Sequence, residues 1–248
     1  MVHNIEALRE RFYNLFSKLM GEYELEKALY EGMPEDVEDC WNKEREAVSD
    51  LHIWVGTGCT KFVIGDEDCD YIIKFQPPCL EEEHSNYDYC GREVEVYNAA
   101  VVEGFADKFA WCAKLFDYEL EDGSKLPVYV MEYCQCSYES ISDDMDDWHY
   151  SKFCTSRHIE KSDKAWEEYD NVKYDETFDE RMMEWAYSVW GLDFNAIVEP
   201  GVKTIAQFMR EMCINDIHCG NWGWCHNKLV LTDYSGYGCD LSNREIEY

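Results

Sequence analysis

Three short runs of apolar and β-branched residues follow one another between residues 51 and 75, and they constrain the fold more than any other feature. The runs cover residues 51–55, 62–64 and 71–75, and glycine-rich or acidic turns separate them. Such runs between turn residues are typical of β-strands. Similar runs at residues 126–131 and 229–233 predict two more strands.

Helical patterns lie around these strands. Within residues 4–30, apolar side chains recur in steps of three and four, which places them on one face of a helix. A second helical pattern covers residues 92–110, and a third covers residues 182–212 with a break near Pro200 and Gly201. The expected order is a helix, several strands, a helix and a strand, followed by a largely helical region. The apolar face of the first helix consists of Ile5, Leu8, Phe12, Leu15 and Leu19.

The chain is strongly acidic. Its 248 residues include 53 acidic and 22 basic side chains, which gives a formal net charge of −31 at pH 7. Nucleic-acid phosphates and anionic lipid headgroups repel such a chain, so we expect no direct nucleic-acid binding and no membrane binding. A cationic partner, or mimicry of nucleic acid, is compatible with this charge. With 46% hydrophobic and 15% aromatic residues, the composition is unlike that of a disordered protein.

Thirteen cysteines are scattered through the chain. We find neither a signal-peptide pattern nor a run of about 18 apolar residues, and we therefore expect a cytoplasmic protein with reduced thiols. Cys134 with Cys136, or Cys219 with Cys225, would supply zinc ligands in an alternative interpretation. Neither pair stands in paired C-x-x-C knuckles, so free thiols are favoured.

Residues 137–181 are rich in acidic residues and poor in aliphatic ones, although Trp and Tyr recur. The favoured interpretation is a solvated, partly helical acidic insert. The alternative is a binding surface for a cation or for a basic partner.

A glycine-rich stretch at residues 55–63 lies between the first two predicted strands and contains Gly56 and Gly58. Backbone N–H groups at glycines can approach phosphates closely, because no Cβ intervenes. The stretch lacks the Gly-Lys-Ser/Thr of a Walker A loop. Taken alone, it favours an ordinary β-hairpin.

Lys74 stands inside the β-branched run at residues 71–75, where a lysine is unusual unless its ammonium has a partner. A lysine that snorkels from an edge strand is the simpler interpretation. The helical pattern that follows carries Glu93 and Glu95, and either carboxylate could fix the ammonium toward phosphate oxygens. The order of glycine-rich stretch, strand lysine and helix glutamate is that of the nucleotide lobe of protein kinases.

The most informative stretch covers residues 214–224 and contains Asp216, His218 and Asn221. The spacing of Asp216 and Asn221 matches the D-x-x-x-x-N of the kinase catalytic loop, in which the aspartate accepts the hydroxyl proton and the asparagine binds magnesium. Asp233 follows 12 residues after Asn221, at the end of a predicted strand. The metal-binding aspartate of protein kinases has a corresponding position.

From about residue 51 to residue 236, the chain resembles the protein-kinase-like superfamily. The string Asp-Ile-His-Cys-Gly-Asn at residues 216–221 is most similar to the small-molecule branch, such as the aminoglycoside and choline-type phosphotransferases, which use Asp-x-His-x-x-Asn. The chain is more distantly similar to HipA-type kinases. Residues 130–133 resemble the hinge between the lobes, whose backbone pairs with adenine.

The resemblance implies ATP and Mg²⁺ as ligands and a role for each matching residue. Asp216 would be the catalytic base or orienting group, and Lys74 would contact the α- and β-phosphates. Glu93 would pair with Lys74, with Glu95 as the alternative. The other implied contacts are those of Gly56 and Gly58 with the phosphates, of Asn221 and Asp233 with Mg²⁺, and of Met131, Glu132 and Tyr133 with the adenine.

The implied fold is α+β and two-lobed, with a small β-rich nucleotide lobe and a mostly helical C-terminal lobe. Residues 1–50 would form an N-terminal helical extension, residues 51–133 the nucleotide lobe and hinge, and residues 134–248 the C-terminal lobe. The chain departs from the family at Ile214, where His is usual, and at Asp-Tyr-Ser-Gly, which replaces Asp-Phe-Gly. Only 12 residues follow Gly236, where a protein kinase has its activation loop and peptide platform, so a conventional protein kinase is not expected.

These patterns favour a Mg²⁺–ATP-dependent phosphotransferase that acts on a hydroxyl of a cationic small molecule or of a basic protein segment. The alternative is a catalytically weak or inactive kinase-fold protein whose acidic surface binds a basic partner or mimics nucleic acid. A globular domain with accidental motif matches is the third interpretation. Only the enzyme interpretation requires the carboxylate of Asp216.

Overall fold

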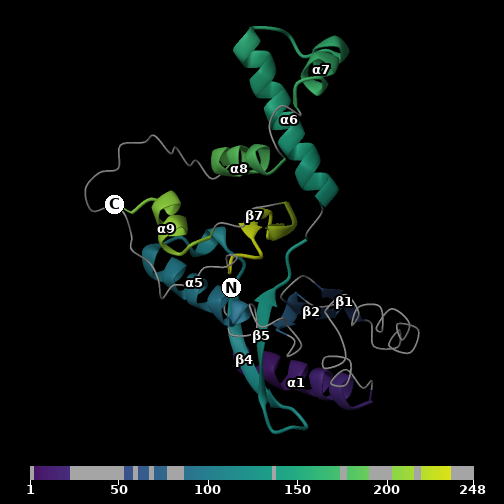
Figure 1. The fold of residues 1–248 in the computed structure, drawn as a ribbon, viewed down its shortest axis with the longest axis vertical. Coiled ribbons are helices and arrows are strands. Elements are labelled where there is room, and N and C mark those ends of the chain that lie inside the picture. Colours follow the sequence, from purple (N-terminus) through teal and green to yellow (C-terminus); the bar gives the residue numbers. More distant parts are fainter. Residues whose placement is uncertain are drawn as a thin grey trace. The chain divides into compact units, whose positions relative to one another are not determined.

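The computed structural model describes residues 3–22, 53–57, 61–66, 70–76, 87–135, 138–173, 178–189, 203–214 and 219–235. This part of the chain is a mixed α+β structure, as expected (Figure 1). It divides into two compact units, Met1–Cys134 and Gln135–Tyr248. The boundary expected between hinge and C-terminal lobe, after Tyr133, lies next to this division.

An antiparallel sheet of five strands organises the first unit. The strand order is β1-β2-β3-β5-β4, so that β5 lies between β3 and β4. Short connections join the first three strands, and short connections permit only antiparallel pairing. The strands are β1 (Ile53–Thr57), β2 (Phe62–Asp66), β3 (Tyr71–Phe75), β4 (Cys112–Glu119) and β5 (Lys125–Glu132).

Helix α1 (Ile5–Glu22) packs on one face of this sheet through the apolar face that its residue spacing predicts. The side chains of Phe12, Phe16 and Leu19 are fully buried there. Arg9 Nε donates a 2.7 Å hydrogen bond to the carbonyl oxygen of Leu115 in β4. Over these residues the expected N-terminal extension is an integral layer of the first unit. The strand residues of this core are Phe62, Ile64, Ile73, Phe75, Leu115, Leu126, Val128 and Val130.

Helix α5 (Tyr89–Glu103) lies against the opposite face of the sheet. The side chain of Asp88 caps its first turn by accepting a 2.8 Å hydrogen bond from the N–H of Gly91. The hydroxyl of Tyr129 also donates to Asp88. Tyr129 alternates along β5 with Val128 and Val130, which face α1. The contact with Tyr129 therefore ties the start of α5 to the side of the sheet that α1 leaves open.

The second unit is mostly helical and contains a small hairpin. Strands β6 and β7 pair antiparallel, and His226 and Asn227 form the turn between them. These two residues have positive φ angles of 48° and 63°, which suit a two-residue hairpin turn. The elements are α6 (Tyr138–Arg157), α7 (Asp163–Asp170), α8 (Phe178–Val189), α9 (Ile205–Glu211), the 3-10 helix η4 (Cys219–Asn221), β6 (Trp222–Cys225) and β7 (Lys228–Leu231).

The expected acidic insert, residues 137–181, contains α6, α7 and the start of α8, and it has a small core of its own. Tyr150 of α6 and Tyr169 of α7 are buried in this core, together with Cys154 and Ala165. The buried guanidinium of Arg181 donates to the hydroxyl of Tyr169 at 2.8 Å and also pairs with Asp146. The insert is therefore less solvated than expected, because its recurrent aromatic residues pack together.

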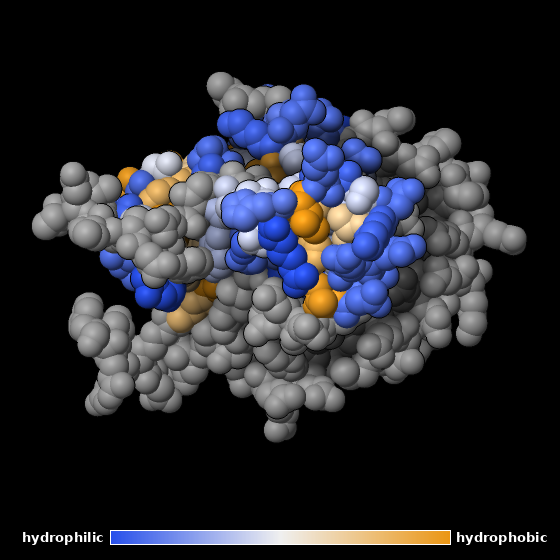
Figure 2. All heavy atoms as spheres, turned by 90° about the horizontal axis from the view of Figure 1, so that it is seen from above, coloured by the Kyte–Doolittle hydropathy of each residue, from blue (hydrophilic) through white to orange (hydrophobic). Residues whose placement is uncertain are grey.

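Hydrophilic residues cover most of the described surface that is visible in Figure 2. Hydrophobic side chains are visible in this view only as small separate areas. Among the helices that the structure describes, none has both the length and the apolar composition needed to cross a membrane.

Two strands were not expected from the sequence, β4 and β6. The stretch Cys-Ala-Lys-Leu-Phe-Asp-Tyr-Glu of β4 has no β-branched residue, and it is a strand because it pairs along β5, with an irregularity between Lys114 and Phe116. The helical pattern at residues 92–110 corresponds to α5 and the 3-10 helix η2 (Ala106–Lys108). Of the third helical pattern, residues 182–189 lie in α8 and residues 205–211 form α9.

Candidate functional site

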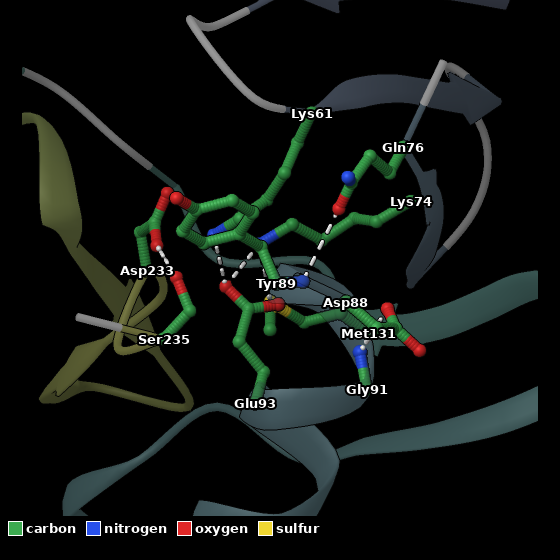
Figure 3. A network of polar contacts seen from close by, with 10 residues as sticks. All are labelled: Lys61, Lys74, Gln76, Asp88, Tyr89, Gly91, Glu93, Met131, Asp233 and Ser235. Atoms are coloured by element: carbon green, nitrogen blue, oxygen red, sulfur yellow. Dashed lines mark hydrogen bonds and ion pairs between the residues drawn. The ribbon is translucent and has the colours of Figure 1, made fainter. Parts of the chain in front are cut away.

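A buried ion pair joins β3 to α5. The ammonium Nζ of Lys74 lies 2.8 Å from Oε1 of Glu93, and the two side chains are only 6% and 2% exposed (Figure 3). The alternative partner, Glu95, is 68% exposed and pairs with Arg92 on its own helix. Of the two carboxylates that the sequence offered to Lys74, the structure therefore uses Glu93.

A second lysine binds the same carboxylate. Lys61 directly precedes β2, and its Nζ also lies 2.8 Å from Oε1 of Glu93, with a side chain that is 5% exposed (Figure 3). Lys61 is not among the site residues predicted from the sequence. The signal that could have identified it is its spacing: a strand that begins at residue 62 directs residue 61 to the face opposite Phe62.

Strand alternation and register explain why both lysines reach Glu93. Val63 is the cross-strand partner of Lys74, so Lys61 and Lys74 project from the same face of the β2–β3 ladder. Phe62 and Phe75 alternate with these lysines and enter the core beneath α1. The same two strands thus supply an apolar core on one face and a charged cluster on the other.

Neighbouring groups close this cluster on the side of α5. Sδ of Met131, in β5, lies 3.8 Å from Nζ of Lys74.

Burial, and then the charge of Glu93, raise the pKa of the Cys90 thiol, so Cys90 stays protonated at neutral pH. Burial and the hydrogen bond to Asp88 likewise raise the pKa of Tyr129, which therefore remains a hydrogen-bond donor to Asp88. Buried charges require partners, and Glu93 of α5 is the partner both of Lys61, which precedes β2, and of Lys74 in β3.

The glycine-rich stretch forms part of a β-hairpin. Gly56 lies in β1 opposite Val63, and the last pair of the ladder is Thr57 with Phe62. Gly58 lies outside the described residues. Lys61 lies between β1 and β2, so one of the two buried ammonium groups belongs to the glycine-rich stretch itself.

The predicted hinge, residues 130–133, is the end of β5 and the one residue after it. Met131 is buried and pairs with Ile72 of β3 and Cys112 of β4. The N–H of Glu132 donates to the carbonyl of Trp111 at 2.8 Å, and the N–H of Tyr133 donates to the carbonyl of Asp70 at 2.7 Å. A base that accepted from either N–H group would have to displace one of these bonds.

Asn221 and Asp233 come together at the open end of the β6–β7 hairpin, within the second unit. Asn221 precedes β6 and Asp233 follows β7, and the carbonyl of Asn221 accepts from the N–H groups of Thr232 at 2.8 Å and Asp233 at 3.4 Å. Asn221 is buried, Asp233 is half-buried, and Ser235 Oγ lies 3.4 Å from Asp233 Oδ1 (Figure 3). An amide oxygen and a carboxylate held on adjacent strand ends are ligands of the type that Mg²⁺ takes in proteins.

The predicted catalytic residue Asp216 and its neighbour His218 lie outside the described residues. The same holds for Cys136 of the zinc alternative. The cysteines whose side chains the structure describes are not in disulfide bonds: Cys90, Cys112, Cys134, Cys154, Cys213 and Cys225.

The predicted site residues are thus found in two groups, one in each unit. Lys61, Lys74 and Glu93 form the group in the first unit, and Asn221 and Asp233 form the group in the second. In the comparison with known proteins, no protein-family model matches this chain, and neither the curated proteins nor the solved structures gave a match.

Proposed function

We propose that this protein is a Mg²⁺–ATP-dependent phosphotransferase with a protein-kinase-like, two-lobed fold. The observation that carries the proposal is the buried ion pair between Lys74 and Glu93. In protein kinases a lysine on the third strand pairs with a glutamate on the helix that follows, and the lysine contacts the α- and β-phosphates. Lys74 lies in β3, and α5 with Glu93 is the next described helix along the chain.

The elements around this ion pair support the same proposal. A glycine-containing hairpin precedes the lysine strand, and α5 lies in sequence between β3 and β4. This is the order in which a protein kinase presents its glycine-rich loop, its lysine and its glutamate. An ion pair retained only for stability is a poor alternative, since well-packed apolar residues of similar volume are often equally stabilising.

Asn221 and Asp233 are the proposed Mg²⁺ ligands. Their backbones are hydrogen-bonded to each other, which brings together two residues that lie 12 positions apart in the sequence. Bound Mg²⁺ neutralises charge on the phosphate oxygens during transfer. The contribution of this chain is positioning: Asn221 and Asp233 hold the metal, and Lys74, oriented by Glu93, binds phosphate oxygens.

Asp216 is the proposed group that accepts or orients the proton of the acceptor hydroxyl. The proposed acceptor is cationic, a small molecule or a basic protein segment, because the chain carries a net charge of −31. The acidic binding protein without catalysis is the competing proposal, and the same charge supports it. Asp216→Asn separates the two, since phosphoryl transfer requires the carboxylate and attraction of a basic partner does not.

Thermal unfolding with and without Mg²⁺–ATP tests the nucleotide site. At about 100 times Kd, a ligand stabilises by roughly 2.7 kcal/mol, which is a shift of about 5–10 °C for a chain of this length. We expect this shift for the wild type and for Asp143→Ala, which removes an exposed carboxylate of α6. Asp233→Ala should lose the magnesium-dependent part of the shift. A wild type that does not respond to millimolar Mg²⁺–ATP would exclude the proposal.

A further inference from the structure

We propose that Lys61 is a second phosphate-binding lysine and that the nucleotide polyphosphate is held by two ammonium groups, those of Lys61 and Lys74. This inference deepens the proposed function and rests on it for the identity of the ligand. A kinase-type site has one such lysine, on the third strand. Here a second ammonium, from the residue that directly precedes β2, lies at the same distance from the glutamate carboxylate.

The geometry of the cluster is the first support. Nζ of Lys61 and Nζ of Lys74 each lie 2.8 Å from the same atom, Oε1 of Glu93. A single oxygen therefore holds the two ammonium groups close together (Figure 3). Neither ion pair is a solvent-exposed contact, because the side chains of Lys61, Lys74 and Glu93 are all buried.

The charge of the three side chains is the second support. The triad brings two ammonium groups to one carboxylate. An ammonium is a compact charge with three donors, so each lysine can keep its bond to Glu93 and still donate to a phosphate oxygen. A polyphosphate, with several anionic oxygens a few ångströms apart, matches two ammonium groups held in this way.

The position of Lys61 in the chain is the third support. It lies within the glycine-rich stretch, three residues after Gly58, and directly precedes Phe62, which is anchored in the core beneath α1. Glycine-rich backbone and a lysine on the same segment would approach the same phosphates. Lys61 also has a fixed direction, because the Val63–Lys74 register places both lysines on one face.

Equilibrium titrations with Mg²⁺–ATP and with inorganic tripolyphosphate test this inference. The proteins are the full-length wild type, Lys61→Met, Lys74→Met and the double variant. Lys114→Met is the matched control, because Lys114 is a lysine of the same sheet whose side chain is 48% exposed and pairs with Asp117. We expect each single Met variant to raise the Kd for both ligands by tenfold or more, and the double variant to lose binding. Lys114→Met should keep the wild-type Kd.

The outcomes distinguish this inference from the proposed function. If Lys61→Met binds Mg²⁺–ATP and tripolyphosphate with the wild-type Kd while Lys74→Met does not, the second lysine is excluded and the phosphotransferase proposal stands. If the wild type binds tripolyphosphate through both lysines but gains nothing from the nucleoside, the two-lysine site stands and the ATP proposal fails. If the wild type binds neither ligand, both fail.

A second variant, Lys61→Gln, tests the inference if Lys61→Met does not fold. Lys61→Gln removes the charge but keeps an N–H donor for Glu93, so it should remain folded if Lys61→Met does not. Unfolding midpoints without ligand identify which variant to use. A wild-type Kd for a folded Lys61→Gln would exclude the inference in the same way.

Discussion

The two faces of the sheet in the first unit differ although the same strands build them. On the face beneath α1, the alternate residues of β2, β3 and β5 are large and apolar, and they pack with Phe12 and Phe16. On the face toward α5, the residues between them include two lysines and Tyr129, and they bind Glu93 and Asp88. The α1 face stabilises the unit through the burial of apolar surface, and this hydrophobic effect is non-directional. The α5 face fixes the positions of individual side chains, because ion pairs and hydrogen bonds join particular atoms.

The largest expected effect tests the apolar face. Phe16→Ala should lower the free energy of unfolding by about 3–5 kcal/mol, because it leaves a cavity among aromatic rings of α1 and the sheet. Asn14→Ala, an exposed change on the same helix, should have almost no effect. Denaturant titrations measure both. Equal and small effects would mean that α1 contributes little to the stability of the first unit.

The next effect tests the charged face. Glu93→Gln should destabilise by about 3 kcal/mol, because two buried ammonium groups lose the carboxylate that they share. Lys61→Met should cost less, since Glu93 keeps Lys74. The same denaturant titrations give the order of the two. A Glu93→Gln protein as stable as the wild type would show that the cluster is solvated in solution.

The two faces should also differ in their dependence on pH. Because burial and Glu93 raise the pKa of Cys90 above its value in the unfolded chain, the folded state retains a proton that the unfolded state releases above about pH 9. The contribution of Cys90 to stability is therefore full below that pH and is lost as pH rises. Between pH 8 and pH 10 this contribution should fall by about 1 kcal/mol in the wild type, and the fall should be absent in Cys90→Ala. Parallel stability–pH curves for the two proteins would contradict this assignment.

The smallest expected changes in stability come from replacing one glycine in α5 and one glycine in α1 by alanine. At Gly91 of α5, an added Cβ would lie 2.3 Å from Asp88 Oδ2 and 2.9 Å from the Tyr129 hydroxyl, so Gly91→Ala should disturb the cap and cost about 1 kcal/mol. At Gly21 of α1, an added Cβ meets nothing within 4 Å, so Gly21→Ala should stabilise by up to about 1 kcal/mol. Unfolding midpoints of the two variants should therefore move in opposite directions. A shift of the same sign would show that the cap at Asp88 adapts.

The sequence predicted those features that depend on local pattern. The spacing of Phe12 and Leu19 identified α1, and the β-branched run around Lys74 identified β3. The choice of Glu93 over Glu95 came from the family resemblance, and the structure has that contact. The roles of these residues, and those of Asn221 and Asp233, stay predictions.

Other features depend on contacts between distant parts of the chain and could not be predicted. The face that Lys61 occupies follows from strand alternation, but its contact with Glu93 depends on the packing of α5, 32 residues later, against the sheet. β4 exists because β5 offers it a partner, and not because of its own composition. The bonds of the Glu132 and Tyr133 N–H groups are invisible in sequence for the same reason: their acceptors, Trp111 and Asp70, belong to other segments.

The position of α1 has a consequence for synthesis of the chain on the ribosome. Arg9 and Leu115, which are hydrogen-bonded across the α1–β4 contact, are separated by 106 residues. At typical translation rates, the aromatic face of α1 is made on the order of 10 s before β4 and β5 can cover it. During that interval Phe12 and Phe16 remain available to chaperones and to neighbouring nascent chains. The helix that stabilises the finished unit is therefore also the segment that most needs protection while the unit is incomplete.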